Sequence, residues 1–288
     1  MPNPHFYNLA EVESAIVSTQ FAGHLKYFAS VTSTSDLALQ AAQSGARHGV
    51  WIAGEQTAGR GRGSHTWHSS PGAGLYMSVL IAPPISTMSA LSLSFTAAIV
   101  VQSAISSVVG FRRRDQIDIR WPNDLLLTRK DGPARKCAGI LIDTASNPAT
   151  SSQPATLRYA VIGIGINVNH TTFPPELDPI ATSLRRESFT RSVENGTKCL
   201  RREPLTAAIL LALDTELRTL TSNLKPRTSD FSLYSSWISG KRVRVEARED
   251  GSGSYTGITA GLDPNGFLRV HGDDGQLHTV LSGGLREP

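Results

Sequence analysis

Cysteine is scarce in this sequence, and its scarcity excludes a disulfide scaffold. The 288 residues include two cysteines, Cys137 and Cys199, which lie far apart and lack the spacing of a metal-binding pair. We interpret them as free thiols in a reducing compartment. The N-terminus has no basic segment followed by an apolar one, and no apolar run approaches the ~18 residues that cross a bilayer. We therefore expect a soluble, cytoplasmic protein without a membrane partner.

Charge of either sign is also limited. Charged residues make up 18% of the chain and hydrophobic residues 40%, which excludes disorder by composition and supplies a sizeable core. The net charge is +4 and the pI about 9.2. This mildly basic balance suits anionic ligands but falls short of a nucleic-acid-binding protein. The length indicates one large domain, or one domain plus a small one.

Apolar patterning predicts alternating helices and strands before residue 240. Ser35 and Gly45 are the expected N-cap and C-terminal stop of the first helix. A Ser/Thr/Pro-rich insert at 146–156 predicts a hairpin tip. The expected helices are 36–44, 89–110, 203–222 and 231–239, and the expected strands are 48–56, 75–83, 117–127, 136–144 and 157–169.

The pattern changes after Gly240 to short alternating runs separated by DGSG, DPNG and DDG. These separators are hairpin signals at close spacing. Residues 240–288 are therefore expected to form a small all-β barrel of about five strands.

One loop, in AGEQTAGRGRGSHTW (53–67), alternates glycines with Arg60 and Arg62. It could be a surface loop with solvated arginines, an RNA-binding arginine–glycine tail, or a loop that wraps an anion. Glycines let backbone N–H groups approach a ligand, and guanidinium groups suit carboxylate or phosphate. The flanking strands disfavour a disordered tail. A dinucleotide-binding motif is excluded because a strand, not a helix, follows the glycines.

Two further segments carry polar groups on predicted strands. In RWPNDLLL (120–127), a carboxylate at the mouth of a strand could hold Mg²⁺ or an adenosine group, and a simple turn is the alternative. In KCAGILID (136–143), Lys136 could meet a buried carboxylate or phosphoryl oxygen. A solvated lysine at the strand edge is the alternative there.

A third segment, GIGIN (163–167), removes side chains from one face of a strand. A flat ligand could lie on that face, with the amide of Asn167 at the strand end. Close packing of a helix on the strand is the alternative.

These motifs, in this order and followed by a small β barrel, resemble the biotin protein ligases, also called biotin–[acetyl-CoA-carboxylase] ligases. The resemblance covers about residues 25–288. It implies an α+β fold: a central mixed β-sheet flanked by helices, like class II synthetases and lipoate ligases, over residues 1–236. An SH3-like barrel would occupy residues 237–288. A lipoate or octanoate ligase of the same fold is the alternative.

The implied reaction uses ATP to activate biotin as biotinyl-5′-AMP and then transfers biotin to a lysine of a biotin carboxyl carrier protein. Neither step needs an enzyme nucleophile, because the protein must position two anions, stabilise charge on phosphorus and exclude water. The glycine–arginine loop is therefore interpreted as a clamp over the acyl-adenylate. About 30 residues precede the Ser-Thr motif, too few for a DNA-binding winged helix, so no DNA partner is expected. A homodimer is one option for the oligomeric state.

The resemblance also assigns residue roles, with Arg62 and Lys136 as the catalytic pair. Biotin-binding roles fall to Ser33, Thr34, Ser35, Gln56, Gly59, Arg60, Gly61, Arg62, Trp67, Lys136, Gly139, Gly163 and Gly165. ATP-binding roles fall to Arg60, Arg62, Asn123, Asp124, Lys136 and Asn167, with Mg²⁺ arriving with ATP and meeting Asp124. Ser35, Ser64 and His65 depart from the family pattern, which has asparagine, glycine and a basic residue there.

Overall fold

A computed structural model describes residues 7–83, 85–87, 90–112, 115–128, 132–149, 155–188, 199–222, 231–246, 253–281 and 283–288. The strands of its larger sheet are β1 (Leu25–Phe28), β2 (Gly49–Ala53), β3 (Gly74–Ile81), β4 (Ile117–Arg120), β5 (Asp124–Leu127), β6 (Arg135–Asn147) and β7 (Thr156–Asn167). The smaller sheet contains β8 (Ser239–Glu246), β9 (Tyr255–Leu262), β10 (Leu268–Gly272), β11 (Leu277–Val280) and β12 (Gly284–Arg286). The helices are α1 (Leu9–Ala15), α2 (Thr34–Gln43), α3 (Ala90–Val109), α4 (Leu184–Glu187) and α5 (Glu203–Ser222).

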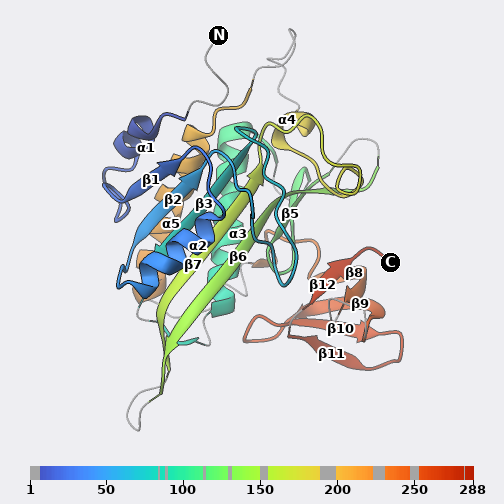
Figure 1. Ribbon diagram of the computed structural model, residues 1–288. Helices are drawn as coiled ribbons and strands as arrows, with labels where there is room; N and C mark the ends of the chain where they lie inside the picture. Colours follow the sequence, from blue (N-terminus) through green and yellow to red (C-terminus); the bar gives the residue numbers. More distant parts are fainter. Residues whose placement is uncertain are drawn as a thin grey trace.

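The larger sheet has the strand order β1-β2-β3-β7-β6-β5-β4 (Figure 1). β1 pairs parallel with β2, and the other neighbours pair antiparallel, so the sheet is mixed. α3 and α5 pack together on one face, and α2 covers the other. All eight residues of β3 are buried because both faces are covered, which explains its unbroken apolar run. The expected α+β architecture is confirmed.

One apolar run is longer than the sequence analysis allowed. Leu91–Val109 of α3 has a mean hydropathy of 1.6 and is long enough to cross a membrane by length and composition. However, 78% of it is buried inside the fold, against the sheet and α5. A helix that is apolar on all sides is expected in a protein core, so the run is weak evidence for a membrane span.

The smaller sheet has the order β11-β10-β9-β8-β12, which confirms the five expected strands. It docks against the end of the larger sheet through polar contacts. Asp118 of β4 accepts hydrogen bonds from the N–H (3.0 Å) and the hydroxyl of Ser236. Nε1 of Trp121 donates to the carbonyl of Gly266 at 3.3 Å. The domain boundary at residues 236/237 stays a prediction.

Three expected elements differ from the structure. The strand predicted over 117–127 is two strands, β4 and β5, because Pro122 has no N–H to donate and the chain turns there. The N-cap of α2 is Ser33, whose Oγ accepts from the N–H of Asp36 at 3.3 Å. The helix predicted over 231–239 is missing from residues 232–238, where serine side chains bond to β4 instead.

Two elements near the N-terminus, α1 and β1, were not predicted. β1 has only four residues, LKYF, and one of them is a lysine. Such a short edge strand carries too little apolar alternation to be recognised, and it forms because β2 supplies a parallel partner.

Gly266, in the turn between β9 and β10, contacts helix α3 and offers a test of how the smaller sheet docks. Gly266 has φ +90°, and a Cβ there would lie 2.7 Å from a ring carbon of Phe95 in α3. Gly275 has φ +78° with nothing within 4 Å of an added Cβ. We expect Gly275→Ala to lower the free energy of unfolding by about 1 kcal/mol through backbone strain, and Gly266→Ala by about 3 kcal/mol because overpacking is added. Equal losses in urea titrations would contradict this docking contact.

Candidate active site

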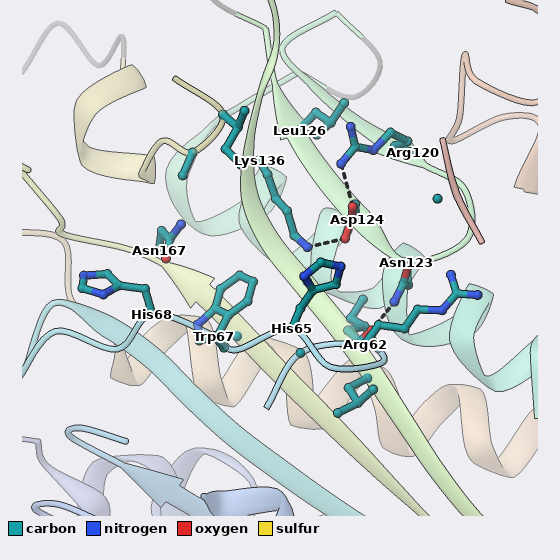
Figure 2. A pocket seen from close by; sticks show the side chains of 18 of the residues that line it. Arg62, His65, Trp67, His68, Arg120, Asn123, Asp124, Leu126, Lys136 and Asn167 are labelled. Atoms are coloured by element: carbon teal, nitrogen blue, oxygen red, sulfur yellow. Dashed lines mark hydrogen bonds and ion pairs between the residues drawn. The ribbon is translucent and has the colours of Figure 1, made fainter. Parts of the chain in front are cut away.

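A cavity of about 870 Å³ opens between the larger sheet, the loop around Arg62 and the end of the smaller sheet (Figure 2). It is lined by the residues predicted for the site, except Ser33 and Gly59, which lie just outside it. Residues that the sequence analysis did not single out also line it: Ser78, Arg120, His68, Phe173, Trp237, Glu246 and 283–287. The motifs scattered through the sequence therefore converge on one hollow.

An ion-pair cluster occupies one wall of the cavity. Asp124, the first residue of β5, lies 2.5 Å from Nζ of Lys136 on β6 and 2.7 Å from a guanidinium nitrogen of Arg120 on β4. Figure 2 shows both cations converging on this carboxylate. Burial raises the pKa of Asp124, but the charges of Lys136 and Arg120 outweigh it and bring the pKa to about 2. Asp124 is therefore ionised and holds both cations in place.

The same contacts decide how Asp124 fits a metal ion. Its Oδ1 is engaged by Lys136 and its Oδ2 by Arg120. Within the described part of the chain, no group of three or more His, Cys, Asp and Glu side chains is placed to hold a metal. In this arrangement Asp124 does not fit the role of a Mg²⁺ ligand.

Gly139 and Gly165 form one side of the cavity, which we name the glycine floor, and the ring of a tryptophan lies on it. Gly139 and Gly165 are register partners on β6 and β7. A Cβ at Gly165 would lie 2.5 Å from Cε2 of Trp67, and a Cβ at Gly139 would lie 3.0 Å from Cζ3 of the same ring. Nζ of Lys136 lies 5.4 Å from the ring centroid. In this structure the floor supports Trp67 itself rather than lying open for a flat ligand.

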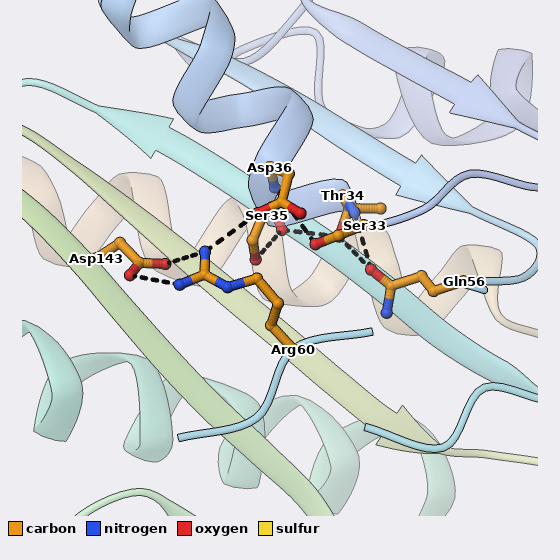
Figure 3. Close-up of polar contacts among 8 residues, drawn as sticks. Ser33, Thr34, Ser35, Asp36, Gln56, Arg60 and Asp143 are labelled. Atoms are coloured by element: carbon orange, nitrogen blue, oxygen red, sulfur yellow. Dashed lines mark hydrogen bonds and ion pairs between the residues drawn. The ribbon is translucent and has the colours of Figure 1, made fainter. Parts of the chain in front are cut away.

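A polar cluster forms the opposite end of the cavity (Figure 3). Oε1 of Gln56 accepts from the N–H of Thr34 at 2.8 Å and lies 3.0 Å from its hydroxyl. The hydroxyls of Thr34 and Ser35 lie 2.8 Å and 3.0 Å from that of Ser78. A Cβ at Gly163 would lie 2.8 Å from Oγ of Ser35, so this glycine makes room for close helix–strand packing. Ser78, the one serine in the otherwise apolar and aromatic run GLYMSVL, was the signal missed in β3.

Residues 59–67, which we name the flap, form a small hairpin. The N–H of Trp67 donates to the carbonyl of Gly59 at 2.8 Å, and the N–H of Gly61 donates to that of His65 at 2.8 Å. Gly63 takes φ +63° near the tip. A Cβ at Gly59 would lie 2.6 Å from the carbonyl oxygen of Trp67, and a Cβ at Gly61 would lie 2.9 Å from that of His65. Both glycines are therefore needed for the tight hairpin, a role that the sequence analysis did not foresee.

The two flap arginines have different partners. Nη1 of Arg62 donates to the carbonyl of Gly283, beside β12, at 2.8 Å. Burial lowers the pKa of Arg62, and the nearby charge of Asp124 opposes that effect. Arg60 instead meets the carboxylates of Asp36 and Asp143. The smaller sheet thus completes the cavity, which no sequence motif indicated.

Two predicted asparagines hold neighbouring segments. Nδ2 of Asn123 donates to the carbonyl of Ile140, and Nδ2 of Asn167 donates to that of Thr182 at 3.1 Å. Both line the cavity, so each can present its amide oxygen while its nitrogen braces the wall.

A group of aromatic residues lies beyond the Trp67 end. His68 and Phe173 line the cavity, and His170 stacks on Phe173 with ring centroids 5.1 Å apart. Burial, followed by the charge of His68, lowers the pKa of His170 to about 4. His170 is therefore neutral near pH 7 and serves as an apolar support for the wall.

Comparisons with known proteins place this fold and site in a class of carboxylic-acid ligases. A model of the biotin/lipoate A/B protein ligase family matches residues 27–167. A model of the biotin protein ligase C terminal domain matches residues 238–283. Together the two matches define a ligase domain followed by the C-terminal domain found in biotin protein ligases.

Individual relatives narrow the class. The bifunctional ligase/repressor BirA of Bacillus spizizenii is 32% identical, over 92% of this chain and 75% of that protein. The biotin–[acetyl-CoA-carboxylase] ligase of Mycobacterium tuberculosis is 30% identical, over 88% and 84%. The chain belongs to the biotin protein ligase family, as its motifs predicted. A solved Aquifex aeolicus biotin protein ligase in complex with biotin and ATP shares the fold, with TM-score 0.69 and 23% identity over 92% of this chain and 100% of that one.

The ion-pair cluster generates a pH prediction. Because the pKa of Asp124 is lowered on folding, the cluster stabilises the protein above the unfolded pKa of about 3.9 and loses this contribution as the pH falls toward about 2. Between pH 5 and pH 2, we expect the free energy of unfolding of the wild type to fall about 2 kcal/mol more than that of Asp124→Asn. Urea titrations across this range measure the difference. Parallel profiles for the two proteins would contradict the prediction, and the exposed-site control Glu176→Gln should follow the wild type.

Proposed function

We propose that this protein converts biotin and ATP to biotinyl-5′-AMP and then transfers biotin to a lysine of a biotin carboxyl carrier protein. In the first step the biotin carboxylate attacks the α-phosphate of ATP, and pyrophosphate leaves. In the second step the lysine amine attacks the acyl carbon, and AMP leaves. Membership of the biotin protein ligase family supports the proposal. The single observation that carries it is the Lys136 ammonium, held by Asp124 at the glycine floor of the cavity.

Lys136 suits the charge that both steps must handle. Two anions must come together in the first step, so a fixed cation lowers their repulsion and stabilises charge developing on phosphorus. Its side chain is one-third exposed, while Asp124 and Arg120 are 19% and 13% exposed. The ammonium therefore has room to meet a ligand on its open side while Asp124 fixes it from behind.

Arg62 suits the other side of the same reaction. It donates to the neutral carbonyl of Gly283, and this contact does not neutralise its positive charge. In the proposal it meets the biotin carboxylate and the phosphate, and the residues 283–287 close the cavity around them. The ATP end then lies toward Asn123 and Asn167, with their amide oxygens facing the nucleotide.

The polar cluster suits the ureido ring of biotin. Ureido N–H groups need acceptors and the ureido carbonyl needs donors, and hydroxyl and amide groups supply both. Thr34, Ser35 and Gln56 are already fixed by bonds to one another or through Ser78. A site fixed before the ligand arrives loses less entropy on binding.

The flap suits the need to protect an anhydride from water. The flap folds over the cavity, and the side chain of its last residue, Trp67, lies on the glycine floor. We propose that the flap opens to admit biotin and closes over the adenylate until the carrier lysine arrives. Mg²⁺ enters the proposal only as the ion that accompanies ATP. The absence of DNA binding and the cytoplasmic location stay predictions, as does a homodimer.

A labelling experiment tests the function. Purified protein is incubated with ATP, radiolabelled biotin and a biotin carrier domain, with a carrier in which the acceptor lysine is replaced by arginine as the control. We expect label on the intact carrier, dependent on ATP, and none on the control. Labelling with lipoate or octanoate but not with biotin would contradict the proposal and identify the protein as a lipoate or octanoate ligase.

Replacing the central cation tests the chemistry. We expect Lys136→Ala to slow adenylate formation by about 10²- to 10⁴-fold, because a charge contact in a water-poor site is lost. Biotin-dependent exchange of pyrophosphate into ATP measures this step. The matched control is Lys26→Ala, a strand lysine whose Nζ lies 5.7 Å from the ring centroid of Trp51, outside the cavity. Near-normal exchange by Lys136→Ala would remove Lys136 from the mechanism.

A further inference from the structure

Arg60, the first arginine of the flap, is tied to two carboxylates (Figure 3). Its Nη1 and Nη2 lie 3.1 Å from the two oxygens of Asp143, a bidentate arrangement. Nη1 also lies 3.3 Å from Oδ1 of Asp36. Bidentate guanidinium–carboxylate pairs fix geometry more firmly than single contacts. The side chain that the sequence assigned to the ligand is therefore occupied by the protein itself.

The two carboxylates belong to two different elements, and each of these elements also contributes residues to the cavity. Asp36 lies in the first turn of α2, directly after the polar cluster residues Thr34 and Ser35. Asp143 lies on β6, the strand that carries Lys136. Arg60 pairs with Thr66 across the base of the flap. Through Arg60, the base of the flap is thus joined to both α2 and β6.

The charge balance around Arg60 argues against a direct phosphate contact. One guanidinium faces two carboxylates, so the group of three carries a net charge of −1. Such a group does not attract an anionic adenylate. Arg62 donates to a neutral carbonyl, that of Gly283, so this contact keeps its charge for the ligand. The two arginines of one motif therefore differ in electrostatic role.

We propose that Arg60 is a positioning residue that holds the flap closed through Asp143, with Asp36 as a secondary partner. This inference rests on the proposed function for its effect on catalysis, but the closed flap can be measured without any ligand. Side chains in the group are partly exposed, 36% for Arg60, 25% for Asp143 and 53% for Asp36. Partly exposed pairs contribute modestly, so we expect a shift of about fivefold in the ratio of closed to open flap.

Limited proteolysis of the unliganded protein tests the flap directly. Trypsin cleaves after Arg62 when the flap opens, and mass spectrometry of the fragments gives the rate of that cleavage. We expect Asp143→Asn and Arg60→Gln each to raise the rate about fivefold, and the double variant to raise it no further, because both changes break the same pair. Asp36→Asn should have a smaller effect.

A matched pair elsewhere in the chain supplies the control. Arg242 and Asp273 make the same bidentate contact on the smaller sheet, at 2.8 Å and 2.7 Å. Asp273→Asn should leave cleavage after Arg62 at the wild-type rate. If Asp143→Asn also leaves it unchanged, Asp143 does not hold the flap and the proposal is overturned.

A second measurement separates positioning from ligand contact. If the only role of Arg60 is to hold the flap closed, Arg60→Gln and Asp143→Asn should both speed the release of biotinyl-5′-AMP about fivefold. Both variants should change the rate of adenylate formation less than about threefold. If Arg60 contacts the phosphate, Arg60→Gln should slow adenylate formation by more than about 100-fold, and Asp143→Asn should not. That second pattern would overturn the proposal. A wild-type protein that forms no adenylate would instead refute the proposed function, and the proteolysis result would still decide the role of Arg60.

Discussion

The cavity depends on one ion pair, that of Asp124 with Lys136. A lysine beside an apolar strand would ordinarily turn toward water, because burying an unpaired ammonium is costly. Asp124 prevents this by holding the ammonium at 2.5 Å, and Arg120 keeps the carboxylate ionised from its other side. The pair also fixes the position of Trp67, since the indole lies beside the lysine and on the glycine floor. The cation and the indole beside it are therefore positioned by one contact between β5 and β6.

The flap contacts both the larger sheet and the segment beside β12 of the smaller sheet. Arg62 reaches from the flap to the carbonyl of Gly283, while Arg60 reaches back to Asp143 on β6. A single hairpin therefore spans the larger sheet and the smaller one. The glycines at 59 and 61 are required because a side chain at either position would clash with the carbonyl of Trp67 or His65 on the opposite arm of the hairpin. In this structure the glycines of the glycine–arginine motif make the hairpin possible, and the hairpin in turn presents the cation Arg62.

The sequence predicted the sheet strands and the cavity residues well, because both leave local signals. Apolar runs located β2, β3, β6 and β7 to within a few residues, and hairpin separators located the smaller sheet. The partners of Arg60 could not be predicted, because Asp36 and Asp143 lie 24 and 83 positions away. The contribution of 283–287 was hidden for the same reason: its contact with Arg62 spans 221 positions. Motifs identify the residues that meet a ligand, whereas the side chains that brace them are set by the tertiary fold.

In the proposed function, it is the polar end of the cavity that distinguishes biotin from lipoate. Lipoate and biotin share an aliphatic acid chain, so the cationic wall and the flap serve either acid equally. Thr34, Gln56 and Ser78 differ from the cationic wall and the flap, because they present hydroxyl and amide groups inside an otherwise apolar wall. A dithiolane ring has no N–H or carbonyl group to exchange hydrogen bonds with this cluster, and sites built to hydrogen-bond a ligand reject ligands that lack those groups by about 10⁴- to 10⁵-fold. Ser35 stands where the family pattern has asparagine, and its shorter side chain lines the cavity with its hydroxyl 3.0 Å from that of Ser78. In the proposed function, discrimination therefore falls mainly to Thr34 and Gln56, whose hydrogen bond to each other is present without ligand.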